Sequence, residues 1–415
     1  MNTIRKIILS AAMLACAPAV LAQNVKIAYI EPLSGGMANV GELGAKNLGF
    51  IIDEINAKGG VLGGRKFELV TFDNKLSPQE SLVALKSAID QNIQYITQGN
   101  GSSVAAALID GVNKNNDRNP DKRVVFLNHS AVDPDFTNSK CSFWHFRFDA
   151  NSDMKMAAIT DAIKKDTKVK KVFLVNQDYS HGHQVTKAAK AMLKQKRPDV
   201  QIVGEDLHPL AKVKDFAPYV AKIKSAGADT VITGNWGADL TLLIKAAKDS
   251  GLDAQWYTYY AGGFGFAPAV GDAGVGKVKA VVEWHANVPN PKAEAFYASY
   301  KKKYPDAKDE FFYYRMKNMM ELLAKAMEQA KSTDPLKVAQ ALEGMKYQAD
   351  MGEVEMRKDD HQLIQPLFIG TMAKAGTPGV KHDLEGSGYG FSNDIQVPPK
   401  DTALPTTCKM KRPSK

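Results

Sequence analysis

The sequence predicts an α/β protein with parallel sheets, arranged as two successive blocks of strands and helices. Short apolar runs alternate with longer stretches whose apolar residues recur at helical spacing. Glycine-rich or polar loops follow most of the apolar runs. This repetition of strand and helix implies parallel strands joined by right-handed crossovers.

The first block contains four predicted strands, and the spacing of five apolar residues predicts a helix over Gly41–Ala57. A second helix begins at Pro78, and the loop Gly99–Ser103 opens a third. The predicted strands are Val25–Ile30, Phe67–Phe72, Tyr95–Thr97 and Val124–Leu127.

The second block begins after Phe143–Phe148, and its first helix is predicted over Asp153–Lys165. The chain then continues through further helices to a tail from Gly376 that is rich in glycine and proline and is expected at the surface. The predicted strands of this part are Val172–Val175, Gln201–Val203, Thr230–Thr233, Trp256–Tyr260, Val278–Ala286, Val354–Arg357 and Leu363–Met372. Its later helices are predicted over Lys292–Tyr304, over Phe311–Lys331 and from Asp334-Pro335 onward.

Composition excludes several classes of protein. The chain has 415 residues, 44% of them hydrophobic, and a formal net charge of +9, which is typical of globular proteins rather than disordered ones. Its lysines are spread along predicted helices instead of forming one basic face, so we expect no binding to nucleic acid. Only one segment, at the N-terminus, is apolar enough for a membrane, which excludes a protein with many membrane spans.

That N-terminal segment has the features of a secretory signal peptide over residues 1–22. Arg5 and Lys6 precede the apolar run Ile7–Leu21, and Val20-Leu21-Ala22 supplies small residues for cleavage. The run is shorter than the roughly 20 residues of a membrane-spanning helix. An uncleaved anchor and a lipoprotein acylated at Cys16 remain as alternatives. The main prediction is an exported protein.

Export leaves an even pair of cysteines, Cys141 and Cys408, in an oxidising compartment. We therefore predict a Cys141–Cys408 disulfide that ties the tail to the middle of the chain. The sequence does not show that the two residues meet.

Motifs for cofactors, metals and hydrolysis are incomplete. Gly99-x-Gly101 lacks the third glycine of a dinucleotide loop, because Val104 stands there, and no Walker motif exists. His181-x-His183 and Asp359-Asp360-His361 lack further ligands at usual spacing, so we expect neither a metal nor a cofactor. No Gly-x-Ser-x-Gly surrounds Ser180, and the sequence therefore does not favour an enzyme.

Aromatic residues follow several predicted strands and point to a ligand pocket. Tyr179, Trp236, Tyr259 and Tyr260 stand at or just after strand ends, where open α/β sheets bind small ligands. Ser102 and Ser103 open a helix whose free N–H groups suit a small carboxylate. A plain helix cap and ordinary core packing are the structural alternatives.

Two segments carry a resemblance to a known family. They are Lys26–Gly35 and Gly49–Arg65, the second with the pattern Asn-x-x-Gly-Gly-Val-x-Gly. Ala326–Ala341 and Asp359–Gln362 add to it. Over essentially the whole mature chain, the sequence resembles a type I periplasmic binding protein of the branched-chain amino acid (Leu/Ile/Val) family, the solute receptors of ABC importers.

The resemblance implies two Rossmann-like lobes joined by three hinge crossings, near Phe143–Phe148, Val282–Ala286 and Asp350–Glu353. Lobe 1 would comprise residues 23–145 and 285–350, lobe 2 residues 146–284 and 351–395, and a tail residues 396–415. It also implies a periplasmic monomer that delivers a small molecule to membrane permease and ATPase subunits.

The positions that match the family's ligand contacts are Gly101, Ser102, Ser103, His129, Ser130, Ala131, Tyr179, Trp236 and Tyr260. Ser102 or Ser103 would hold a carboxylate, and the His129–Ala131 backbone an ammonium or another polar group. Tyr179 and Trp236 would close over the ligand from the second lobe.

One departure bears on the ligand. Amino-acid-binding members carry an acidic residue in the loop that corresponds to Tyr259–Gly263, and this loop has none. Asp239 is the nearest acidic candidate, although it stands at a predicted helix start, where capping the helix is the alternative. A branched-chain or hydrophobic amino acid, or a related small carboxylate, is the first hypothesis. An aromatic acid, an amide or urea is the alternative, as is a sensor-linked receptor in place of an importer subunit.

Overall fold

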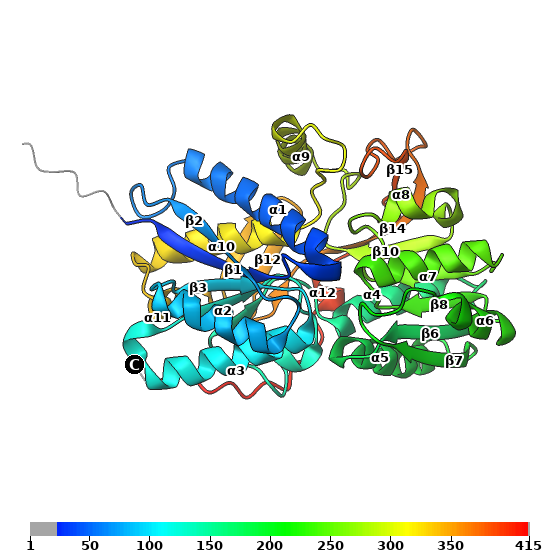
Figure 1. Cartoon of the computed structure of the whole chain (residues 1–415), viewed down its shortest axis with the longest axis horizontal. Helices are drawn as coiled ribbons and strands as arrows, with labels where there is room; N and C mark the ends of the chain where they lie inside the picture. The colour runs from blue at the N-terminus through cyan, green and yellow to red at the C-terminus, as the bar shows by residue number, and fades with distance from the viewer. Residues whose placement is uncertain (1–22, 414–415) are drawn as a thin grey trace, which may run out of the picture.

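The computed structural model describes residues 23–413, which form two lobes side by side (Figure 1). The predicted signal peptide, residues 1–22, lies outside the described residues. In the described part of the chain, no helix is both long and apolar enough to cross a membrane.

The first lobe centres on a parallel five-stranded sheet in the order β2-β1-β3-β4-β5. The strand β1 is buried along nearly its whole length between β2 and β3, which explains its continuous apolar run. The strands are β1 (Val25–Glu31), β2 (Phe67–Asp73), β3 (Tyr95–Gln98), β4 (Val125–Asn128) and β5 (His145–Arg147).

Helices cover this sheet, with α1 beside α10 and α2 beside α3 (Figure 1). As predicted, α11 begins at Pro335, where the Asp334 carboxylate accepts the Lys337 N–H at 3.0 Å. The helices are α1 (Ala38–Ala57), α2 (Pro78–Asp90), α3 (Ser102–Arg118), α9 (Pro291–Lys303), α10 (Tyr314–Ala330) and α11 (Pro335–Leu342).

The second lobe is built on an eight-stranded sheet in the order β15-β14-β10-β9-β8-β6-β7, with β16 also paired to β14. The strands from β10 to β7 are parallel, and β14 to β16 extend the sheet in antiparallel pairing. The strands are β6 (Lys171–Gln177), β7 (Gln201–His208), β8 (Thr230–Thr233), β9 (Gln255–Thr258), β10 (Val278–Val282), β14 (Leu367–Lys374), β15 (Tyr389–Phe391) and β16 (Ile395–Val397).

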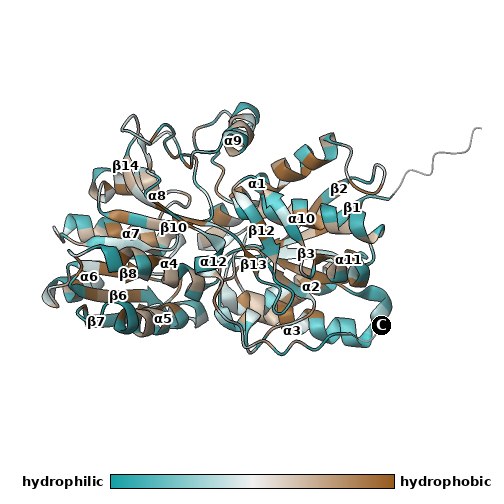
Figure 2. Cartoon of the chain, turned by 180° about the vertical axis from the view of Figure 1, so that it is seen from behind, coloured by the Kyte–Doolittle hydropathy of each residue, from teal (hydrophilic) through white to brown (hydrophobic). Residues whose placement is uncertain are grey.

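The helices of the second lobe are α4 (Ser152–Lys165), α5 (Ser180–Lys196), α6 (Ala217–Ser225), α7 (Gly237–Asp249) and α8 (Phe266–Val270). Figure 2 shows hydrophobic residues on the inner strands of both lobes and hydrophilic residues on the C-terminal segment that runs along the surface. Each lobe thus encloses its own core.

The chain passes between the lobes at residues 148–151 and 283–290, close to two of the predicted crossings. The third predicted crossing, near Asp350–Glu353, is misplaced. There β12 (Gly352–Met356) pairs with β11 (Lys346–Ala349) and β13 (Leu363–Ile364), and this small sheet packs in the core of the first lobe. The chain crosses at residues 365–366 instead, because Pro366 has no N–H and interrupts the predicted strand Leu363–Met372. Residues 351–364 therefore lie with the first lobe.

The C-terminal segment passes between the lobes once more. The short helix α12 (Pro399–Thr402) lies between α4 of the second lobe and β13 of the first (Figure 2). Beyond it, the predicted Cys141–Cys408 disulfide is present and fixes the tail to the first lobe. The Thr406 hydroxyl donates to the Thr137 carbonyl at 2.7 Å, and Arg412 pairs with Glu343 at 2.7 Å.

Replacing Cys141 and Cys408 together by serine lowers the free energy of unfolding by about 2–5 kcal/mol, because the disulfide joins residues 267 positions apart and restricts the unfolded chain. Denaturant unfolding measures this loss. Reducing agent destabilises the wild type by a similar amount and leaves the double-serine variant unchanged. Equal stability of the two proteins would contradict this prediction.

Candidate ligand-binding site

A cavity of about 120 Å³ lies between the two lobes. Its walls come from loops at the carboxyl ends of β3 and β4 in one sheet and of β6, β8 and β9 in the other. One water molecule needs about 10–15 Å³ by the same measure, so the cavity admits a small organic molecule.

The first-lobe wall presents backbone N–H groups. Gly101 caps α3 with a φ of +92°, a conformation that favours glycine. The first turn of α3 begins at the buried Ser102, and its N–H groups have no carbonyl partner inside the helix. This helix start suits the carboxylate of a ligand.

A buried carboxylate fixes the loop before α3. Glu31 accepts the N–H groups of Gly99 at 2.6 Å and Asn100 at 3.2 Å, and it lies 2.8 Å from His129 Nε2. The His129 ring also prevents a side chain at Gly99, where an added Cβ would come within 2.6 Å of it. The loop is therefore held in one shape before any ligand arrives.

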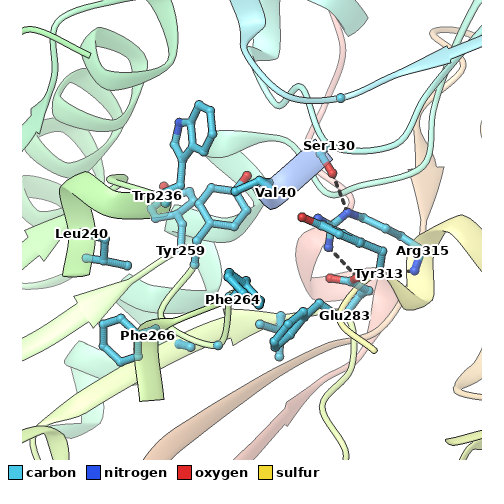
Figure 3. A pocket seen from close by; sticks show the side chains of 18 of the residues that line it. Val40, Ser130, Trp236, Leu240, Tyr259, Phe264, Phe266, Glu283, Tyr313 and Arg315 are labelled. Carbon is cyan, nitrogen blue, oxygen red and sulfur yellow. Dashed lines mark hydrogen bonds and ion pairs between the residues drawn. The ribbon is translucent and has the colours of Figure 1, made fainter. Parts of the chain in front are cut away.

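The second-lobe wall is aromatic. Trp236 Nε1 donates to the Tyr179 hydroxyl at 2.8 Å, and the Tyr259 hydroxyl donates to the Ser152 carbonyl at 2.8 Å. Burial raises the pKa of Tyr179, so its phenol stays neutral. Figure 3 shows Trp236 and Tyr259 across the cavity from Ser130 and Arg315.

Charged side chains complete the cavity at the crossings. Arg315 on α10 donates through Nη1 to Glu283 at 2.7 Å and through Nε to the Ser130 hydroxyl at 2.9 Å. Lys155 on α4 lies 2.9 Å from a carboxylate oxygen of Asp149 and 4.7 Å from the centre of the Tyr260 ring. Burial alone would lower the pKa of Arg315, but the carboxylates of Glu283 and Asp149 raise it, so the guanidinium stays charged.

The structure brings seven of the nine predicted contact residues to the cavity: Gly101, Ser102, Ser130, Ala131, Tyr179, Trp236 and Tyr260. Their contact with a ligand remains a prediction.

The structure places three other residues outside the lining of the cavity. Ser103 is exposed on the outer side of the first turn of α3. His129 lies behind the wall, and its carbonyl accepts the Arg315 Nε–H at 2.6 Å instead of facing the cavity. Asp239 is not among the cavity residues, since its carboxylate accepts from Gln177 at 2.8 Å and from the Ala211 N–H at 2.9 Å.

Sequence reasoning missed the charged residues Lys155, Glu283 and Arg315. Glu283 gave a signal, since it interrupts the apolar run Val278–Ala286. Lys155 and Arg315 lie on predicted helices, where a charged residue is usually exposed, and nothing local marks them as buried.

The histidines considered for a metal lie apart. His181 is in the cavity wall, 2.8 Å from the Ser152 hydroxyl, and burial lowers its pKa to about 4. His183 is exposed and pairs with Asp178. Among the residues described, no group of three potential ligands is placed to hold a metal ion.

Comparison with known proteins agrees with this geometry. Residues 24–377 match the family model described as periplasmic binding protein. The chain is 33% identical over 421 residues to the Leu/Ile/Val-binding protein homolog 4 of Brucella melitensis, and the match covers 97% of each protein.

Solved structures share the fold. The leucine-, isoleucine-, valine-, threonine- and alanine-binding protein from Brucella ovis, in a closed conformation, matches with a TM-score of 0.82 and 31% identity, over 94% of this chain and 100% of that one. A solute-binding protein of an ABC transporter from Rhodopseudomonas palustris BisB5, in complex with 3,4-dihydroxybenzoic acid, has a TM-score of 0.77 at 20% identity, over 91% and 98% of the two chains. The predicted family and the two-lobed fold are thereby confirmed, and the chain belongs to the periplasmic binding protein family.

Proposed function

We propose that the protein is an exported receptor that encloses a small solute between its lobes and delivers it to the permease and ATPase subunits of an ABC importer. The solute is a branched-chain or other hydrophobic amino acid, or a related small carboxylate. The observation that carries the proposal is one cavity with an anion-binding helix start on one lobe and an aromatic wall on the other. The relatives named for leucine, isoleucine and valine support it.

The two ends of the ligand contact different walls of the cavity. Its carboxylate meets the first turn of α3 and Ser102, and its apolar part packs against Tyr179, Trp236 and Tyr260. The lobes already touch at the rim, where a Cβ added to Gly237 would lie 2.8 Å from Met37 Sδ. Opening and closing at the crossings then admits and encloses the solute.

An aromatic acid is the second candidate, favoured by the number of rings around the cavity. The tyrosine, tryptophan and phenylalanine residues that line it are Tyr179, Trp236, Tyr259, Tyr260, Phe264, Phe266, Trp284, Phe311, Phe312, Tyr313 and Phe391. Such a ligand keeps the carboxylate site and replaces an aliphatic side chain by a stacked ring.

One hydrogen-bonded chain in the wall resembles a catalytic relay. The Ser130 hydroxyl lies 2.9 Å from His129 Nδ1, and His129 Nε2 lies 2.8 Å from Glu31. However, Arg315 Nε also donates to the Ser130 oxygen at 2.9 Å, which withdraws electron density from the attacking atom. We propose that the ligand leaves chemically unchanged.

Binding of a cognate solute makes the protein more compact and more stable, because the ligand binds the folded, closed form. A screen of amino acids and aromatic acids by thermal unfolding finds the solute, and small-angle scattering then shows a smaller radius of gyration. At a ligand concentration about 100 times Kd, stabilisation is about 2.7 kcal/mol. If no compound in either class changes melting temperature or radius, the proposal is wrong.

Replacing Trp236 by alanine weakens binding of that solute by about 30-fold or more, since it removes a ring from the wall and the donor to Tyr179. Trp236→Phe keeps a ring without the N–H and gives a smaller loss. Isothermal titration calorimetry measures both. Unchanged affinity in Trp236→Ala would place the ligand elsewhere.

A further inference from the structure

We propose that Glu283 binds the ammonium group of the ligand and so selects zwitterionic amino acids over simple carboxylic acids. This inference rests on the proposed function and names the substrate class of the same cavity. It assigns the ammonium partner to the second crossing, whereas the loop Tyr259–Gly263 contains no acidic residue.

Glu283 is a buried carboxylate in the cavity wall. It follows β10 directly, is 3% exposed, and is the only carboxylate among the cavity-lining residues of the described chain. Its Oε1 accepts from Arg315 Nη1 at 2.7 Å, while Oε2 accepts no hydrogen bond from residues 23–413. One carboxylate oxygen therefore remains available to a donor in the cavity (Figure 3).

Four buried charged groups around the cavity balance one another. Arg315 and Lys155 are cationic, Glu283 and Asp149 are anionic, and all four are buried. A simple carboxylate adds one negative charge to these four groups, which is costly where water is excluded. A zwitterion adds a carboxylate and an ammonium, and the sum of formal charges does not change.

Arg315 is the positioning residue for Glu283. It is held on its other side by the His129 carbonyl at 2.6 Å and the Ser130 hydroxyl at 2.9 Å. Because these contacts lie on the loop after β4, the guanidinium fixes Glu283 relative to the first-lobe wall. That wall is where we propose that the ligand's carboxylate binds. An amino acid would place its ammonium at Glu283 and its carboxylate at that wall of the same cavity.

The test compares ligands that differ only in the ammonium group: L-leucine with 4-methylpentanoate, and L-phenylalanine with 3-phenylpropanoate. Titration calorimetry measures each against wild type and Glu283→Gln, which keeps shape and hydrogen bonding but loses the charge. We expect wild type to bind the amino acid of at least one pair about 10-fold or more tightly than its acid. We expect Glu283→Gln to abolish that preference, because it lowers the affinity for the amino acid and leaves the affinity for the acid unchanged.

Two further variants serve as controls for the charge of Glu283 and for its position. Glu283→Asp retains the charge, and it should keep a preference for the amino acid even if both affinities fall. Glu294→Gln removes an exposed carboxylate outside the cavity and should bind all four compounds as wild type does.

The outcomes separate the two claims. If wild type binds the acids as tightly as the amino acids, or if Glu283→Gln weakens both members of a pair equally, the role of Glu283 is overturned while the receptor function stands. If wild type binds none of the four compounds and no other small carboxylate, the proposed function is overturned and this inference with it.

Discussion

The buried guanidinium of Arg315 connects the first-lobe wall of the cavity to two of the crossings. It joins the loop after β4 to Glu283 in the second crossing, and it lies 3.7 Å from Asp149 in the first. Asp149 in turn pairs with Lys155 of the second lobe. A buried charge without its partners costs several kcal/mol, so these groups keep the crossings and the ligand-facing loops in register.

Around this centre, two lobes with separate cores leave the crossings as the natural place for motion. The tail adds a covalent restraint, since it leaves β16 in the second lobe and is attached to the first lobe by the Cys141–Cys408 disulfide. Any motion of the lobes is therefore restricted to linkers that are fixed at both ends, and a ligand held by both lobes would shift their equilibrium toward the closed form.

Most of the fold was predictable from sequence, because buried parallel strands and amphipathic helices leave strong local patterns, as at Val25–Ile30 and Gly41–Ala57. The wall residues Ser102, Tyr179 and Trp236 were predictable for the same reason, since they follow strand ends. The third crossing was not, because it occupies two residues within an apolar run. Arg315 was not either, since only the assembled fold brings it from a distant helix to Glu283. Lys155 lies close to Asp149 in the sequence, but no local pattern indicates that this pair is buried.

A crystal structure of the complex with the tightest-binding solute would show where the solute lies and which groups of the two lobes contact it. We expect the solute in the cavity between the lobes, with its carboxylate at the first turn of α3 and its apolar part against Trp236. A solute bound to one lobe alone, or on an outer surface, would contradict it.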